Sequence, residues 1–89
     1  MTLRLAGSHS LKEKRQVVRS LLERVRRRYN AAVAEVDEQD SWQTAVIGIA
    51  VLSGQAAHAD QQLARVLEFI EGMRLDAEGV DSRTEVIPA

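Results

Sequence analysis

Apolar and polar positions alternate in three stretches of the chain, and a fourth stretch is largely apolar. Residues 1–5 (MTLRL) and 80–87 (VDSRTEVI) alternate as strands do, and residues 31–37 (AAVAEVD) alternate more weakly. Residues 43–52 (QTAVIGIAVL) form an uncharged, β-branched run, which is the strongest strand signal in the chain. The pattern therefore predicts four strands.

Two further stretches repeat their apolar residues at helical spacing. The first opens with a capping box, in which Ser10 is the N-cap and Glu13 stands three residues later. Its apolar stripe comprises Leu11, Val17, Val18, Leu21, Leu22, Val25 and Tyr29. The second stripe comprises Leu63, Val66, Leu67, Ile70 and Met73. Asn30 and Gly72 are suited to ending the two helices.

The predicted order is strand, helix, strand, strand, helix, strand. Two βαβ halves with right-handed crossovers make an α+β fold, a ferredoxin-like βαββαβ sandwich. Its four-stranded antiparallel sheet would carry both helices on one face. The chain has 89 residues, no repeat and no cysteine, so we expect one domain over residues 1–89 with a mainly aliphatic core and no disulfide.

The third predicted strand is apolar on both faces, although the helices cover only one of them. Val46, Ala50 and Leu52 would lie on the open face, and Trp42 stands at the entry to the strand. We therefore expect an interface there, most simply self-association. The alternatives are that a few exposed apolar groups need no explanation, and that Trp42 is a partly buried anchor. The acidic residues expected on this face are Glu35, Asp37, Asp81 and Glu85.

Charge is divided unevenly along the chain. Residues 1–29 hold nine basic and two acidic residues, and residues 30–89 hold three basic and eleven acidic ones. Opposite the apolar stripe of the first helix we expect a basic ridge of Lys12, Arg15, Arg19, Arg26 and Arg27, together with Glu23. Lys14, Arg24 and Arg28 flank it. The ridge is suited to phosphate contacts; the alternative is a solvated face in which Glu23 pairs with Arg19 and Arg27.

The start of the first helix is a second candidate anion site. Ser8 and Ser10 precede or begin the helix, and Lys12 lies in its first turn. Free backbone amides and the helix dipole attract anions at such a terminus. Ordinary capping by Ser10 accounts for the same residues.

Catalytic and metal-binding motifs are not found. The sequence has no Ser/His/Asp order, phosphate-binding loop or dinucleotide-binding fingerprint. Asp37, Glu38 and Asp40 lack metal-ligand spacing and are expected to shape a turn or pair with basic residues. No cofactor or metal is expected. No apolar run approaches the roughly 18 residues of a membrane span, so the expected location is the cytoplasm, with no membrane partner.

Two segments resemble the YlxP-like family of small bacterial proteins, also described as domain of unknown function 503. They are residues 7–15 (GSHSLKEKR) and 30–43 (NAAVAEVDEQDSWQ), and the resemblance extends over residues 3–86. It implies a ferredoxin-like sandwich and a cytoplasmic bacterial protein whose gene neighbours serve translation. The family offers no established activity or catalytic residues. The first strand is short for the family.

Three functions follow as hypotheses. The first is a non-enzymatic binding module for ribosomal RNA or a ribosome-associated protein, acting through the basic face of the first helix. An alternative is a homodimeric protein-interaction module that uses the open sheet face and has no nucleic-acid role. A third is an enzyme for a phosphorylated metabolite, for which the Arg and Asn pattern of acylphosphatases is missing. Base stacking on the sheet, as in an RRM, would need aromatic residues that the central strands lack.

Overall fold

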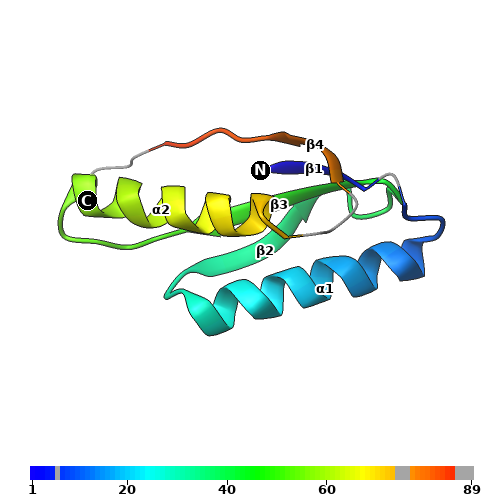
Figure 1. Ribbon diagram of the computed structural model, residues 1–89, viewed down its shortest axis with the longest axis horizontal. Coiled ribbons are helices and arrows are strands. Elements are labelled where there is room, and N and C mark those ends of the chain that lie inside the picture. Colours follow the sequence, from blue (N-terminus) through cyan, green and yellow to red (C-terminus); the bar gives the residue numbers. More distant parts are fainter. Residues whose placement is uncertain (6, 74–76, 86–89) are drawn as a thin grey trace.

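The computed structural model describes residues 1–5, 7–73 and 77–85, with the backbone alone for residues 77–81 (Figure 1). Its elements are β1 (Thr2–Leu5), α1 (Leu11–Arg28), β2 (Ala32–Asp37), β3 (Thr44–Ala50), α2 (Ala56–Glu71) and β4 (Ala77–Asp81). Two helices combine with an antiparallel sheet, and the predicted α+β class is confirmed.

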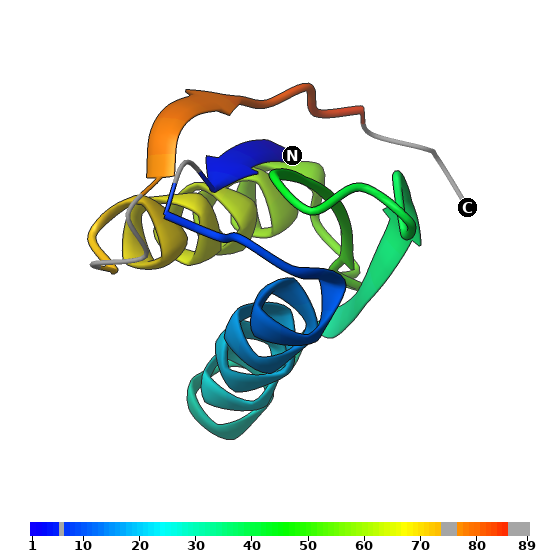
Figure 2. The ribbon, with the colours of Figure 1, turned by 90° about the vertical axis from the view of Figure 1, so that its right-hand side faces the viewer.

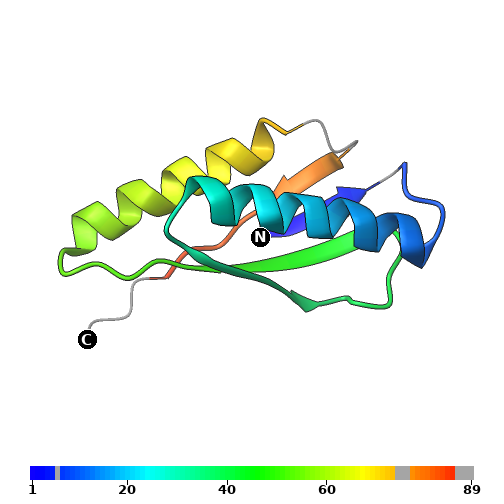
Figure 3. The ribbon, with the colours of Figure 1, turned by 90° about the horizontal axis from the view of Figure 1, so that it is seen from below.

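The strands of the sheet lie in the order β2-β3-β1-β4. Every pair of neighbours is antiparallel, and Leu3 of β1 lies opposite Ala45 of β3. β2 is therefore an edge strand, next to β3 alone. Figure 2 shows the sheet curving around the two helices, and Figure 3 shows α1 in front of the sheet with α2 to one side.

The core lies between the helices and one face of the sheet. Leu3, Leu5, Ala45 and Ile47 alternate along β1 and β3, and each is at most 2% exposed. The residues that complete the buried cluster are Val18, Leu21, Val25, Val33, Val66 and Ile70. Both predicted helical stripes supply it, because their spacing of three and four places one face of each helix over the sheet.

The ends of the helices agree in part with the prediction. Ser10 is the N-cap of α1, and its side chain accepts a hydrogen bond from the Glu13 amide at 3.1 Å. The chain leaves α1 at Tyr29 in an extended conformation, one residue before the predicted stop at Asn30. α2 begins at Ala56, earlier than its apolar stripe, and Gly72 is its C-cap as predicted.

The last strand lies earlier than the sequence pattern predicted. β4 spans Ala77–Asp81 instead of residues 80–87. Residues 82–85 continue without strand pairing, and residues 86 and 87 lie outside the described part of the chain. The pairing of β4 with β1 ends with Thr2 opposite Asp81.

Candidate functional site

Four cations of the basic ridge are exposed along α1. Lys12, Arg15, Arg19 and Arg27 all lie on the surface. None of them forms a side-chain hydrogen bond or ion pair with another residue in the described part of the chain, and neither does Glu23. The alternative in which Glu23 neutralises Arg19 and Arg27 is therefore not what the structure shows. These four side chains are free to meet an anionic partner.

Arg26, the fifth predicted ridge residue, is committed to the sheet. Its guanidinium donates a hydrogen bond of 2.8 Å to the carbonyl oxygen of Val33 in β2. β2 is an edge strand, so this carbonyl would otherwise remain open to a foreign strand. Arg15 and Arg19 fall on the same side of α1 as Arg26 at helical spacing, so they lie on the flank nearer the free edge of β2.

The opposite flank of α1 turns toward α2. The Arg28 guanidinium lies 5.1 Å from the ring centre of Phe69 and 5.9 Å from that of Tyr29. The two rings meet edge to face with their centres 5.5 Å apart. Arg28 therefore packs against the aromatic contact between the helices by a cation–π interaction, and it is separated from the ridge.

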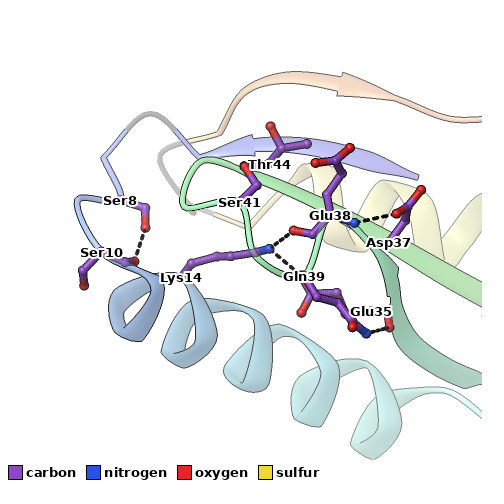
Figure 4. Close-up of polar contacts among 9 residues, drawn as sticks. All are labelled: Ser8, Ser10, Lys14, Glu35, Asp37, Glu38, Gln39, Ser41 and Thr44. Carbon is purple, nitrogen blue, oxygen red and sulfur yellow. Dashed lines mark hydrogen bonds and ion pairs between the residues drawn. The ribbon is translucent and has the colours of Figure 1, made fainter.

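Lys14 does not face the solvent, although its place in the basic cluster had suggested that it would. Its side chain is 0% exposed, and its Nζ lies 2.6 Å from Oε2 of Glu35, which is 16% exposed (Figure 4). Glu35 lies opposite the buried Ile47 in the sheet register. The prediction that Glu35 belongs to the open face is therefore wrong: it faces the helices, where it neutralises the buried ammonium group.

The same ammonium group holds the loop between β2 and β3. Lys14 Nζ donates to the carbonyl oxygen of Glu38 at 2.5 Å, and the Ser41 amide donates to that oxygen at 3.0 Å. Glu38 has a φ of 55°, and its amide donates to Oδ1 of Asp37 at 2.8 Å. Of the three acidic residues predicted to shape the turn, Asp37 does so through its carboxylate and Glu38 through its backbone.

The buried pair joins the two segments on which the family resemblance rests. Lys14 comes from residues 7–15, and Glu35 and Glu38 come from residues 30–43. A sequence signal did exist. The helical stripe has no member between Leu11 and Val17, and position 14 lies three residues after Leu11 and four before Val18, which is the spacing of a core residue.

The start of α1 is already occupied by protein groups. Ser8 is 5% exposed, and its hydroxyl donates to the Ser10 carbonyl oxygen at 3.2 Å. The Glu13 carboxylate accepts a hydrogen bond of 2.8 Å from the His9 amide. An anion arriving here would meet the negative charge of Glu13, so Ser8 and Ser10 are poorly placed to bind phosphate.

The predicted interface residues differ in exposure. Leu52 is 95% exposed and Trp42 is 55% exposed, whereas Val46 is half-buried and Ala50 is exposed. Trp42 is thus more open than a partly buried anchor would be. Val36, at 58% exposure, adds a further apolar side chain that the prediction did not select.

The described residues offer no grouping of three or more His, Cys, Asp or Glu side chains suited to a metal ion. Nor does any helix in this part of the chain combine the length and apolarity needed to cross a membrane.

Comparison with known proteins agrees with the resemblance seen in the sequence. The family model described as "Protein of unknown function (DUF503)" matches residues 1–84. The "Uncharacterized protein YlxP" of Bacillus subtilis (strain 168) is 40% identical over 76 residues, which cover 85% of this chain and 82% of the relative.

Proposed function

This chain belongs to the DUF503 family, and we propose from its own surface that it is a non-enzymatic module that binds RNA through the basic ridge. The expected target is ribosomal RNA, since the resemblance implies gene neighbours that serve translation. A ribosome-associated protein with an acidic surface is the corresponding protein target. We place the module in the cytoplasm.

One observation carries the proposal: Lys12, Arg15, Arg19 and Arg27 are exposed and have no described partner. Arg15 and Arg19 are one turn apart, which places them about 6 Å apart along the helix axis. Each cation that neutralises a phosphate releases counterions, and the apparent affinity then falls steeply with salt. Arg26 contributes less, because its guanidinium is bonded to Val33.

The chemistry of the ridge favours the phosphate backbone over the bases. Recognition of unpaired bases depends on aromatic side chains for stacking. Tyr29 and Phe69 contact each other between the helices, and Trp42 lies in the β2–β3 loop, outside α1. We therefore expect binding with little sequence preference.

The test is a pair of matched double variants. Arg15→Glu/Arg19→Glu alters the ridge, and Arg24→Glu/Arg65→Glu makes the same change of charge at exposed positions outside it. Binding to ribosomal RNA is measured at several salt concentrations. We expect the ridge variant to lose affinity and to flatten the slope of log K against log salt by roughly 1.4 to 1.8.

Two results would reject the proposal. One is wild-type binding that does not depend on salt. The other is an equal loss in both double variants, because that would make the ridge no more than general positive charge.

We also propose a fold assignment, based on the order of the elements and of the strands. The element order and the strand order β2-β3-β1-β4 support a ferredoxin-like βαββαβ sandwich with four antiparallel strands and two helices on one face. An experimental structure tests this assignment, and the pairing of β4 with β1 is the contact to inspect.

A homodimer through the open sheet face is the second candidate. The exposure of Leu52 at 95%, Trp42 at 55% and Val36 at 58% favours it. Val46 and Ala50 of β3 are the other predicted interface residues. Sedimentation over a wide concentration range tests it. Leu52→Asp should weaken a dimer, whereas Ala57→Asp on exposed α2 surface should not. A wild-type monomer at high concentration contradicts it.

A further inference from the structure

Glu23 is the acidic residue of the basic ridge and lies within its line of cations. Arg19 precedes it and Arg27 follows it, each by four residues, a spacing at which opposite charges on a helix commonly pair. Neither pair forms among the residues that the structure describes, and the Glu23 side chain is exposed. An exposed carboxylate repels phosphate. The ridge therefore suits a polyanion that has no phosphate opposite Glu23.

The cations of the ridge stand in two groups on either side of this carboxylate. Those before Glu23 are Lys12, Arg15 and Arg19, and Arg27 comes after it. Arg19 and Arg27 are eight residues apart, which is about 12 Å along the helix axis. Two lines of phosphate with a groove between them match this arrangement. The single line of phosphates in an unpaired strand does not supply such an interval.

The ridge offers no surface on which unpaired bases could stack. The aromatic residues of the chain are Tyr29, Trp42 and Phe69, and none of them belongs to the ridge. Tyr29 meets Phe69 between the helices, with the ring centres 5.5 Å apart. Proteins that hold single strands combine a basic groove with aromatic platforms, whereas the ridge is the convex outer face of α1. Bases that are already paired need no such platform.

In an RNA duplex the groove that fits is the minor groove. The major groove of A-form RNA is too deep and narrow for side chains to read, whereas the minor groove is wide and shallow and displays 2′-hydroxyl groups. A hydroxyl donates a hydrogen bond, and an ionised carboxylate is a strong acceptor. α1 has a single face to offer, because Val18, Leu21 and Val25 on its other side are buried in the core (Figure 2). A shallow groove accommodates such a face.

From these features we propose that the ridge binds base-paired RNA across its minor groove. Arg15 and Arg19 contact phosphates of one strand, and Arg27 contacts phosphates of the other. Between them, the Glu23 carboxylate accepts a hydrogen bond from a ribose 2′-hydroxyl. Glu23 thereby sets a preference for RNA over DNA, whose sugar lacks this hydroxyl. The inference rests on the RNA binding proposed above and names the form of RNA that is bound.

Four nucleic acids of one sequence test the proposal. They are an RNA duplex of about 16 base pairs, the span of a known duplex-binding domain, the same duplex with 2′-fluoro riboses, the DNA duplex, and one RNA strand that does not fold on itself. Fluorine cannot donate a hydrogen bond. By fluorescence anisotropy at one salt concentration, we expect the wild type to bind the RNA duplex about tenfold more tightly than the 2′-fluoro or DNA duplex. The single strand should also bind more weakly than the RNA duplex.

Glu23→Ala is the decisive variant, and Glu68→Ala at an exposed position of α2 is its matched control. Each removes one exposed carboxylate, so a general gain in attraction for a polyanion is expected in both. Glu23→Ala should bind the three duplexes with similar affinity, because the acceptor for the hydroxyl is gone. Glu68→Ala should keep the wild-type preference for the RNA duplex.

The outcomes separate this inference from RNA binding itself. Equal affinity for the single strand and the RNA duplex overturns the minor-groove proposal, as does a preference for the DNA duplex or an unchanged preference in Glu23→Ala. RNA binding by the ridge stands in those cases if Arg15→Glu/Arg19→Glu still weakens it. Absence of binding to both the RNA duplex and the RNA strand overturns the two proposals together.

Discussion

Lys14 and Glu35 meet between α1 and β2, with Nζ 2.6 Å from Oε2 and no exposed surface left on the lysine. A charge can remain inside a small core because it is paired and its other protons find acceptors. Here the second acceptor is the Glu38 carbonyl oxygen. The most basic segment of the chain therefore contributes one of its cations to the structure itself.

Breaking this pair from one side should be costly. Lys14→Met leaves the Glu35 carboxylate, 16% exposed, without its counterion, so we expect the free energy of unfolding to fall by about 3 kcal/mol. Lys14→Met/Glu35→Leu removes both charges and should recover most of that loss. Urea denaturation measures both.

Lys12→Met is the matched control, because Lys12 lies two residues from Lys14 on the exposed side of the helix and should change stability by less than about 0.5 kcal/mol. If the double variant were as unstable as the sum of Lys14→Met and Glu35→Leu, the two residues would be independent, contrary to this account.

The backbone of Glu38 gives a second prediction. Its φ of 55° is a left-handed conformation that costs a side-chain-bearing residue roughly 1–2 kcal/mol. Glycine avoids this cost, but part of the gain is offset because glycine loses more conformational entropy on folding. Glu38→Gly should therefore raise the free energy of unfolding by up to about 1 kcal/mol, and Glu38→Val should lower it. The carbonyl that binds Lys14 remains in both. Thermal unfolding of both variants decides the sign, and a loss of stability in the glycine variant would refute the prediction.

Gly48 of β3 lies beneath Val36 at the bulge of β2. A Cβ atom at Gly48 would stand 2.8 Å from Cγ1 of Val36, and the β-branched side chain has few rotamers with which to withdraw. We expect Gly48→Ala to destabilise the fold by about 1–2 kcal/mol.

The same substitution should change sign in a Val36→Ala background. With the valine methyl groups gone, alanine at position 48 is a better strand residue than glycine by roughly 0.5–1 kcal/mol. Chemical denaturation of the four proteins completes the cycle. An equal effect of Gly48→Ala in both backgrounds would show that the contact with Val36 is unimportant.

The N-cap of α1 is the basis of a fourth prediction. The Ser10 hydroxyl accepts from the Glu13 amide at 3.1 Å, and Ser10→Ala should cost about 1 kcal/mol of stability. Ser10→Asp keeps an acceptor and should cost less. Ser20→Ala, at an exposed position inside α1, is the control and should be neutral or slightly stabilising. Thermal unfolding compares the three, and a similar loss for alanine and aspartate at position 10 would argue against the cap.

The helices and the inner strands could be predicted from the sequence because each rests on a local signal. Ser10 and the spacing of Val18, Leu21 and Val25 identify α1 without knowledge of the rest of the chain. The uncharged, β-branched run around Ala45 and Ile47 does the same for β3. Local patterning and the final packing agree at these positions.

The place of β4 and the roles of Lys14 and Arg26 could not be predicted, because they depend on contacts with residues distant in the sequence. The place of β4 is set by its register with β1, in which Thr2 lies opposite Asp81, and no pattern within residues 80–87 carries that information. Lys14 looks like its basic neighbours until Glu35 is brought beside it. Arg26 looks like Arg19 until the Val33 carbonyl is placed at the edge of the sheet.

This last difference separates stability from binding on one helix face. Arg26→Ala loses the 2.8 Å bond to Val33 and uncovers the edge of β2, so it should lower the free energy of unfolding by about 1 kcal/mol. Arg19→Ala removes an exposed side chain with no described partner and should change stability by less than about 0.5 kcal/mol. Affinity for ribosomal RNA should fall more in Arg19→Ala than in Arg26→Ala, because the Arg19 guanidinium has no described partner and that of Arg26 is bonded to Val33. Urea denaturation and salt-dependent RNA binding of the two variants together test this. A larger loss of RNA affinity in Arg26→Ala than in Arg19→Ala would show that the bond to Val33 yields when RNA binds, and that Arg26 belongs with the free cations of the ridge.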